Sequence, residues 1–218
     1  QPLFNYFKQL FAQVTNPPLD AIREELVTSV ATFIGSEQNL FDETPLHARQ
    51  LRLKEPLLTN EELERIRAAD LPGVKAATIS TLFAANSGIG GLKNAVELVR
   101  KQASQAIKDG CTILVLSDRG VDVDHVPIPS LLAVSALHHH LIREGTRVKV
   151  GIVLESGEPR ETHHFAALIG YGAGAVNPYL ALETIAGLVN DSRINGGLTI
   201  EQAQANYFKA LHKGVVKV

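Results

Sequence analysis

The sequence has 218 residues, of which 45% are hydrophobic and 20% charged, and its formal net charge is −2. This composition is that of a globular protein with a real core, and it excludes disorder as the main state. The lack of a basic excess argues against nucleic acid as a partner. The single cysteine, Cys111, excludes a disulfide framework, a CxxC redox centre and an all-cysteine cluster within this chain.

No stretch of the chain has the features of an export or membrane signal. The N-terminus lacks the basic start, apolar run and cleavage site of a signal peptide. The longest uncharged run, residues 162–182, contains two histidines, a proline and several glycines, so it predicts helix, turn and strand rather than a membrane span. These features favour the cytoplasm and no membrane partner. The chain also lacks methionine, even at position 1, which favours an excised or processed piece.

Residues 1–70 are expected to form a helical, loop-rich lead-in that packs on the rest. Its first apolar stripe has helical spacing and ends before Asn16-Pro17-Pro18; the stripe is Leu3, Phe4, Phe7, Leu10 and Phe11. Asp20 caps a second predicted helix, which runs to about Gly35. Its apolar face is Ile22, Leu26, Val30 and Phe33. Residues 36–58 are expected to be loop-rich, and a capping box at Thr59 starts a short helix.

From residue 71 the pattern changes to alternating strands and helices. The predicted strands are residues 76–83, 111–116, 149–154 and 173–176. The predicted helices are residues 90–109, 129–144, 160–170, 179–189 and 199–214. Such alternation indicates βαβ units around a parallel sheet. Because about four strands are too few to close an eight-stranded barrel, we predict an α/β fold with a partial, barrel-like (β/α) core over residues 71–218.

A glycine-rich segment, residues 86–91, lies between a predicted strand and a predicted helix. Backbone N–H groups at a helix N-terminus can hold a phosphate, so Ser87, Gly88 and Gly90 are candidate ligand-binding residues. The segment has no GK[ST] and does not fit GxGxxG with its acidic partner. The alternative is a flexible connection in which glycine serves the turn geometry.

Charged residues follow the next two predicted strands. Asp118 and Arg119 follow one strand, and Glu155 ends the other. Because ligands bind at the carboxyl ends of parallel strands, these three are further candidate ligand-binding residues. The structural alternative is that Asp118 and Arg119 tie the loop down by ion pairs and hydrogen bonds. Ser156 lies in no GxSxG elbow, and no catalytic residue is predicted.

The histidines cluster at residues 138–140 and 163–164. Adjacent residues on a helix point about 100° apart, so neither cluster easily shares one metal ion, and neither contains HExxH. We therefore predict no metal site and interpret these residues as packing or surface histidines. A mixed site with one histidine from each helix is the alternative. Cys111 is predicted to be a buried, inert thiol.

Several long segments together resemble the central domain of glutamate synthase. They are LFNYFKQLFAQVTNPP (residues 3–18), IREELV (22–27), ILVLSDRG (113–120), PIPSLLAVSALHHHLIR (127–143), ESGEPRETHHFAALIGYGAGAVNPYLALET (155–184) and TIEQAQANYFKALHKGVVKV (199–218). The resemblance covers nearly the whole chain and is weakest between residues 36 and 110. These strings are far more specific than the short motifs rejected above.

The resemblance implies a part of an enzyme that makes two glutamates from 2-oxoglutarate and glutamine. In that family an amidotransferase domain releases ammonia from glutamine, and a barrel domain with FMN and an iron–sulfur cluster reduces 2-iminoglutarate. The central domain scaffolds these two domains, helps form the ammonia tunnel and holds no cofactor of its own. A small NADPH-oxidising subunit or ferredoxin supplies electrons to the parent enzyme. The chain alone is then inactive.

One family position carries over to a residue of this sequence. The threonine of the QVTNP motif lies beside the tunnel entrance in the family, and here it is Thr15. The alternative for Thr15 is a cap of the following turn. The aromatic residues near it are expected to pack against neighbouring domains; they are Phe4, Tyr6, Phe7 and Phe11. The competing interpretation of the whole chain is a standalone barrel-like enzyme that binds a phosphorylated or flavin ligand at the strand ends.

Overall fold

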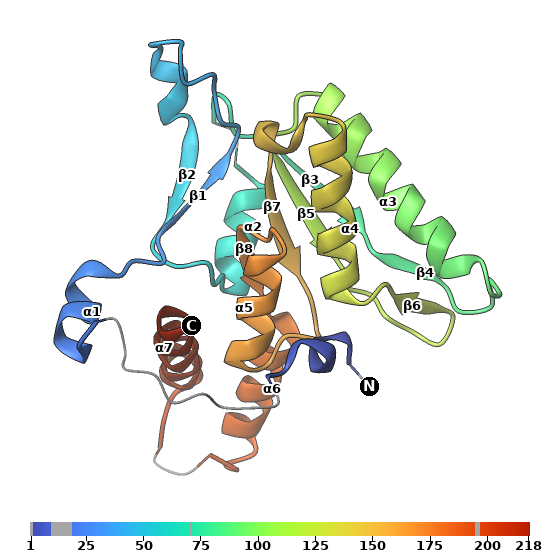
Figure 1. Ribbon diagram of the computed structural model, residues 1–218. Coiled ribbons are helices and arrows are strands. Elements are labelled where there is room, and N and C mark those ends of the chain that lie inside the picture. The colour runs from blue at the N-terminus through green and yellow to red at the C-terminus, as the bar shows by residue number, and fades with distance from the viewer. Residues whose placement is uncertain (1, 10–18, 70, 195–196) are drawn as a thin grey trace.

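The computed structural model describes residues 2–9, 19–69, 71–194 and 197–218. Its centre is a parallel sheet with the strand order β3-β5-β7-β8 (Figure 1). The strands are β3 (Ala76–Ser80), β5 (Ile113–Ser117), β7 (Gly151–Glu155) and β8 (Ala175–Asn177). The segment at residues 56–58 lies parallel to β8, with the N–H of Leu58 donating to the carbonyl of Val176 at 3.0 Å. No closed barrel forms within the described residues, which confirms the predicted partial, barrel-like α/β fold.

Helices connect the strands or follow the last one, and they build the larger part of the core on one face of the sheet. They are α3 (Gly91–Lys108), α4 (Ser130–Arg143), α5 (Thr162–Gly170), α6 (Tyr179–Asn190) and α7 (Ile200–Lys217). Alternate strand residues, such as Leu114 and Ile152, are buried in this core together with Val99 of α3 and Phe165 of α5. All five residues of β5 and of β7 are buried, because helices or lead-in residues cover both faces.

The opposite face of the sheet is covered by the lead-in. Helix α2 (Asn60–Arg67) starts at the predicted capping box of Thr59 and Glu62 and buries Leu63 and Ile66. These side chains pack with strand residues such as Val115 and Val153. Strand β1 (Thr32–Gly35) adds Ile34, which lies so close to Gly151 that a Cβ there would come within 2.2 Å of it. The lead-in thus fills the side that further strands would cover in a closed barrel.

Two small antiparallel pairs lie beside the main sheet. Strand β1 pairs with β2 (Gln50–Leu53), and this hairpin projects away from the sheet at the upper left of Figure 1. Strand β4 (Leu82–Ala84) pairs with β6 (His125–Pro127). Short 3-10 helices complete the described elements: η1 (Leu3–Phe7), η2 (Pro45–Ala48) and η3 (Arg147–Lys149).

The second predicted helix is wrong beyond Val27. Helix α1 (Ala21–Val27) begins after Asp20, whose carboxylate accepts the N–H groups of Ile22 and Arg23, but Phe33 belongs to strand β1. The helical spacing of apolar residues continues across the boundary, yet residues 28–32 read Thr-Ser-Val-Ala-Thr. Three of these five are β-branched, and hydroxyl side chains compete for backbone hydrogen bonds, so the helix stops.

The other differences concern short elements. The predicted strand 76–83 is two strands, because at Thr81 the backbone N–H and the hydroxyl both donate to the carbonyl of Ser117. The loop-rich stretch 36–58 contains β2 and η2, and strand β6 was not predicted. The first apolar stripe forms a 3-10 helix, and Leu10 and Phe11 lie outside the described residues. The division at residue 70 stays a prediction.

The packing of α2 on the sheet predicts that shortening a side chain at this contact strongly lowers the free energy of unfolding. Replacing Leu63, which is 1% exposed, with alanine removes methyl groups from the contact between α2 and the sheet. The free energy of unfolding should fall by about 2–5 kcal/mol, as measured by urea denaturation followed by circular dichroism. Arg65→Ala on the exposed side of the same helix should change it by less than about 0.5 kcal/mol. Equal effects of the two substitutions would contradict this account of the inner face.

Candidate functional site

Buried polar side chains gather at the carboxyl edge of the sheet. Within the described residues, the buried polar and charged positions all lie at or just after strand ends, or at the start of the next helix: Thr81, Ser117, Asp118, Ser130, Glu155, Ser156 and Asn177. This is the edge at which parallel α/β folds bind ligands. It also contains three of the candidate ligand-binding residues from the sequence, Asp118, Arg119 and Glu155.

Glu155 is the centre of this edge. It ends β7, its side chain is 1% exposed, and each carboxylate oxygen accepts hydrogen bonds. Arg67 donates to Oε2 at 2.5 Å from the last turn of α2, and Ser117 Oγ donates to the same oxygen at 2.5 Å. Arg119 Nε donates to Oε1 at 2.7 Å. We call Arg67, Ser117, Arg119 and Glu155 the Glu155 network.

Arg119 extends the network to α6. Its Nη1 donates to Glu183 at 2.8 Å, and its guanidinium lies 4.2 Å from the ring centroid of Tyr179. A cation over an aromatic face is attracted by the quadrupole of the ring. Both carboxylate contacts and the ring hold this arginine in one orientation, in agreement with the loop-tying alternative in the sequence analysis.

Asp118 is bound to the next loop rather than to Arg119. Its carboxylate accepts hydrogen bonds from Ser156 Oγ at 2.5 Å and from the N–H of Gly157 at 3.0 Å. Ser156 Oγ in turn accepts the N–H of Glu158 at 3.1 Å. Asp118 therefore fixes the turn that connects β7 to α5. Its side-chain oxygens have partners within the chain, as buried carboxylates require.

The two carboxylates have opposite pKa shifts. Burial raises the pKa of Glu155, but hydrogen bonds from Arg67, Ser117 and Arg119 and the charge of Arg67 outweigh burial, so the pKa lies below its usual value. For Asp118, burial outweighs the hydrogen bonds from its partners, and the pKa is raised. Burial and the nearby Asp118 likewise raise the pKa of Tyr179. Glu155 is thus held as an anion by its own cations.

The glycine-rich segment is separate from this network. Ser87 Oγ donates to the carbonyl of Ala84 at 2.6 Å, so its hydroxyl serves the turn between β4 and α3. Gly88 has a φ of +70°, a conformation that favours glycine, and Gly91 lies where a Cβ would overlap Ser87. Among the described residues, no hydrogen bond or ion pair joins Ser87, Gly88 or Gly90 to Glu155. Ligand binding by the six candidate residues stays a prediction.

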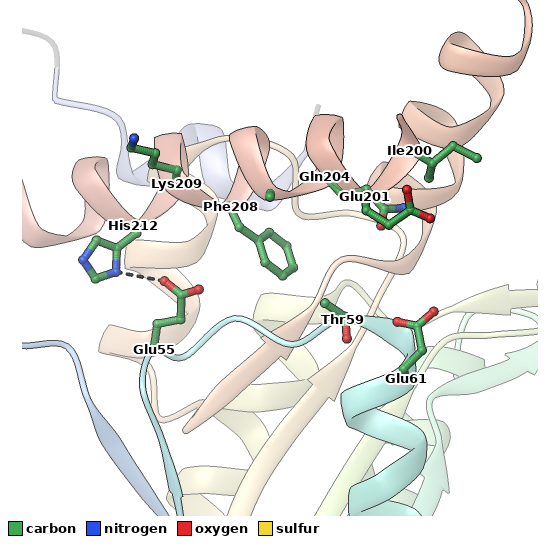
Figure 2. Close-up of a pocket in the computed structure, with 10 residues that line it drawn as sticks. Glu55, Thr59, Glu61, Ile200, Glu201, Gln204, Phe208, Lys209 and His212 are labelled. Atoms are coloured by element: carbon green, nitrogen blue, oxygen red, sulfur yellow. Dashed lines mark ion pairs between the residues drawn. The ribbon is translucent and has the colours of Figure 1, made fainter. Parts of the chain in front are cut away.

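A further cavity lies elsewhere, between α7 and the residues around the start of α2. It has a volume of about 640 Å³, and Figure 2 shows Phe208 pointing into it and His212 beside Glu55, with Nδ1 2.9 Å from Oε2. None of the candidate ligand-binding residues lines it. The residues that do are Glu55, Thr59, Glu61, Ile200, Glu201, Gln204, Ala205, Phe208, Lys209 and His212.

The remaining predictions concern metal ligands, the cysteine, Thr15, the aromatic residues and membrane spans. Within the described ranges, no group of three or more histidine, cysteine, aspartate or glutamate side chains is placed to hold a metal ion. Cys111 is buried just before β5. Thr15 lies outside the described residues. Phe4 was expected to face neighbouring domains but is buried in this chain's own core, whereas Tyr6 is 79% exposed. In the part of the chain that the structure describes, no helix is both long and apolar enough to cross a bilayer.

Sequence reasoning missed several members of this edge. Arg67 is an ordinary helix residue in the sequence, and its partner Glu155 lies 88 positions away. Tyr179 and Glu183 sit on α6 with the spacing of one helix face, but nothing local couples them to Arg119. The recognisable signal was positional: Ser117 and Asn177 each end a strand, where polar residues are exceptional in an apolar run.

Glu155 and Glu183 both bind Arg119, but the Glu155 network predicts that they contribute very differently to the free energy of unfolding. Glu155→Gln leaves Arg67 and Arg119 without their buried counter-charge, and should lower the free energy of unfolding by about 3–5 kcal/mol. Glu183→Gln removes a half-exposed partner of Arg119 and should cost about 0–1 kcal/mol. Urea denaturation of the two variants gives the comparison. A loss for Glu155→Gln no larger than that for Glu183→Gln would show that the network is not essential.

The lowered pKa of Glu155 also predicts a dependence of stability on pH. A carboxyl group with a folded pKa below its unfolded value stabilises the fold above the unfolded value, about 4.5, and loses this contribution as the pH falls through the folded value. The free energy of unfolding of the wild type should therefore decline below pH 4.5. Glu155→Gln, which cannot titrate, should decline less over the same range. If the free energy of unfolding falls equally with pH in the wild type and in Glu155→Gln, Glu155 is not the titrating group.

The comparisons with known proteins agree over the entire chain. The model of the family described as "Glutamate synthase central domain" matches residues 1–218. The chain is 48% identical over 218 residues to the glutamate synthase [NADPH] large chain of Bacillus subtilis, covering 100% of this chain and 14% of that protein. It is 42% identical to glutamate synthase [NADH] of Schizosaccharomyces pombe, covering 99% of this chain and 10% of that protein.

Further similarities extend to other members and to solved structures. The chain is 44% identical to ferredoxin-dependent glutamate synthase of Pyropia yezoensis, covering 99% of this chain and 14% of that protein. The flavin-binding domain of baker's yeast flavocytochrome b2 matches at a TM-score of 0.46 and 15% identity, covering 75% of this chain and 36% of that one. The chain thus spans about a tenth to a seventh of the length of its curated relatives. On the full-length family match and these identities, the chain belongs to the glutamate synthase central domain family.

Proposed function

We propose that this chain is the connecting domain of a glutamate synthase, between an amidotransferase domain that releases ammonia from glutamine and a synthase domain that makes glutamate from 2-oxoglutarate. It scaffolds the two domains and forms part of the tunnel that carries ammonia. The observation that carries the proposal is the family match over all 218 residues. In this proposal the oxidoreductase activity belongs to the whole enzyme, and the chain alone is inactive.

The chemistry of the strand ends supports a connecting role. In a ligand-binding barrel this edge offers free polar groups to a substrate. Here the Glu155 carboxylate is neutralised by Arg67 and Arg119, and Asp118 is bound by Ser156 and Gly157. These groups hold the chain's own loops. The alternative of a standalone enzyme with a phosphorylated or flavin ligand gains no separate support from this geometry.

The surface of the lead-in supports contacts with neighbouring domains. Helix α1 turns Glu24 towards α7, where its carboxylate binds Lys217 Nζ at 3.0 Å, while Ile22 and Leu26 are 76% and 80% exposed. Phe41, near the tip of the β1–β2 hairpin, is 94% exposed. An amphipathic helix normally buries its apolar side. These exposed groups are therefore suited to a partner domain of the same chain.

The cofactors of the proposed enzyme lie in its other parts. An iron–sulfur cluster held by several cysteine thiolates needs ligands from outside this chain, which has one cysteine. FMN likewise belongs to the synthase domain. Relatives named for NADPH, NADH and ferredoxin are 40–48% identical to this chain, so the electron donor is not distinguished here. A small NADPH-oxidising subunit or ferredoxin is then a partner of the whole enzyme, and a single thiol fits a reducing, cytoplasmic location.

The tunnel role is tested at Thr15 in the intact enzyme. Thr15→Leu places a larger, apolar group where we propose that ammonia passes, so ammonia should escape and glutamate formation should fall behind glutamine hydrolysis by severalfold. Thr15→Ser keeps a hydroxyl and should leave the two rates matched. The measurement is the ratio of free ammonia to glutamate formed from glutamine. If Thr15→Leu keeps the wild-type ratio, Thr15 does not line the tunnel.

A further inference from the structure

The N-terminal segment is held on α5 by two adjacent histidines. Phe4 of η1 is 1% exposed, and its ring stacks on His164 with 4.4 Å between centroids. His163 Nε2 lies 3.0 Å from the carbonyl oxygen of the same Phe4. Because a carbonyl oxygen only accepts, Nε2 of His163 carries the proton. One histidine thus binds the ring of Phe4 and the other binds its backbone.

Two outer contacts flank this pair. Lys8 Nζ lies 3.4 Å from Glu161 Oε1, and Phe7 meets Tyr171 edge to face with 5.4 Å between centroids. Glu161 and Tyr171 bracket α5, so one short helix contacts the segment from its beginning to its end. We call Phe4, Lys8, Glu161, His163 and His164 the histidine clasp.

The ring of His164 is itself fixed. Its Nδ1 accepts the backbone N–H of Arg160 at 3.1 Å, so the ring is neutral with its proton on Nε2, 3.4 Å from Glu161. The carbonyl of Arg160 accepts a hydrogen bond from Tyr207 of α7 at 3.0 Å. The clasp is therefore built on a backbone that α7 holds in place.

The histidine clasp lies near the carboxyl edge of the sheet, and its position determines where the N-terminal segment leaves the core. Helix α5 follows β7, so its first turn lies at the carboxyl edge of the sheet. Figure 1 shows η1 beside the same end of α5. Thr15 lies seven residues after Lys8, a reach of at most about 25 Å. The clasp thus fixes the point from which the chain continues towards Thr15.

We infer that His163 and His164 are positioning residues, which hold η1 on the core so that the segment containing Thr15 leaves from a fixed point beside the carboxyl edge of the sheet. This inference rests on the proposed function, because it assigns the histidines to the same ammonia path. Neither histidine touches a reacting group. They act through the backbone of the segment that they bind.

The experiment uses the intact glutamate synthase with two matched double variants. His163→Leu with His164→Ala removes the hydrogen bond and the stacked ring. His163→Gln with His164→Phe keeps a donor for the Phe4 carbonyl and a ring for stacking. His139→Ala, at an exposed position of α4, controls for loss of a histidine elsewhere. The readouts are amide hydrogen exchange of residues 3–9 and the ratio of free ammonia to glutamate formed from glutamine.

In the disruptive pair, protection of residues 3–9 should fall by at least about tenfold, since a hydrogen bond and a stacked ring are lost together. The ammonia-to-glutamate ratio should rise severalfold. The conservative pair and His139→Ala should both show the wild-type protection of residues 3–9 and the wild-type ratio of ammonia to glutamate. If the disruptive pair does not fold, His163→Leu alone, which keeps the stack, is compared with His163→Gln in the same way.

Three results would overturn the inference, and they separate it from the proposed function. Unchanged exchange in the disruptive variant shows that the histidines do not hold the segment. Faster exchange with an unchanged ratio, while Thr15→Leu releases ammonia, removes the positioning role and leaves the tunnel proposal standing. An unchanged ratio in both the clasp variant and Thr15→Leu removes the tunnel role, and the inference with it.

The clasp should also weaken in acid. Burial lowers the pKa of His164; Glu161 opposes this shift, whereas His163, Lys8 and Arg160 add to it. A histidine with a folded pKa below its unfolded value of about 6.5 stabilises the fold above that value and loses this contribution as the pH falls through the folded value. Protection factors of residues 3–9 should therefore decline below pH 6.5 in the wild type. They should stay level there in the variant His164→Phe; a parallel decline would exclude His164 as the titrating group.

Discussion

The contact between Glu155 and its two arginines joins three parts of the chain that are far apart in sequence. Arg67 brings the end of α2 to the sheet, Arg119 brings the loop after β5, and Glu183 extends the contact to α6. A carboxylate that is 1% exposed is stable only with such partners. Because Arg67 belongs to the lead-in, the same contact keeps α2 on the face of the sheet opposite α3–α7. There Leu63 and Ile66 pack against strand residues in a smaller hydrophobic core.

This arrangement is compatible with the connecting role proposed above. A closed barrel covers its inner face with its own strands and leaves polar groups at the strand ends for ligands. Here α2 and Ile34 cover the inner face, and the polar groups at the strand ends bind one another. Among the described residues, the polar groups at the strand ends hold the chain's own loops, and η1 packs beside the same edge. In the proposed enzyme, loops held in this way would give the connecting domain fixed contact points for its neighbours.

The sequence predicts the central elements because their signals are local. The apolar runs of β5 and β7 follow from burial on both faces, and the capping box at Thr59 sets the start of α2. Prediction from the sequence fails where the local signal is weak or where the contact is distant in sequence. Phe33 continues a helical spacing but lies in β1, and β6 is three residues with a proline. Asp118, Arg119 and Glu155 are found at the expected edge, whereas Arg67 depends on tertiary contacts that no local pattern contains.

The outward apolar side of α1 bears on the order in which the chain acquires its structure. Collapse of the core gives little driving force to a helix of seven residues that turns Glu24 inwards and leaves Ile22 and Leu26 in water. Its described contacts are local or distant in sequence: Asp20 caps its N-terminus and pairs with Arg23, and Glu24 binds Lys217. Because Lys217 lies 193 positions after Glu24, the two side chains meet only once the strands between them have been synthesised. We therefore expect α1 to settle after the sheet has formed.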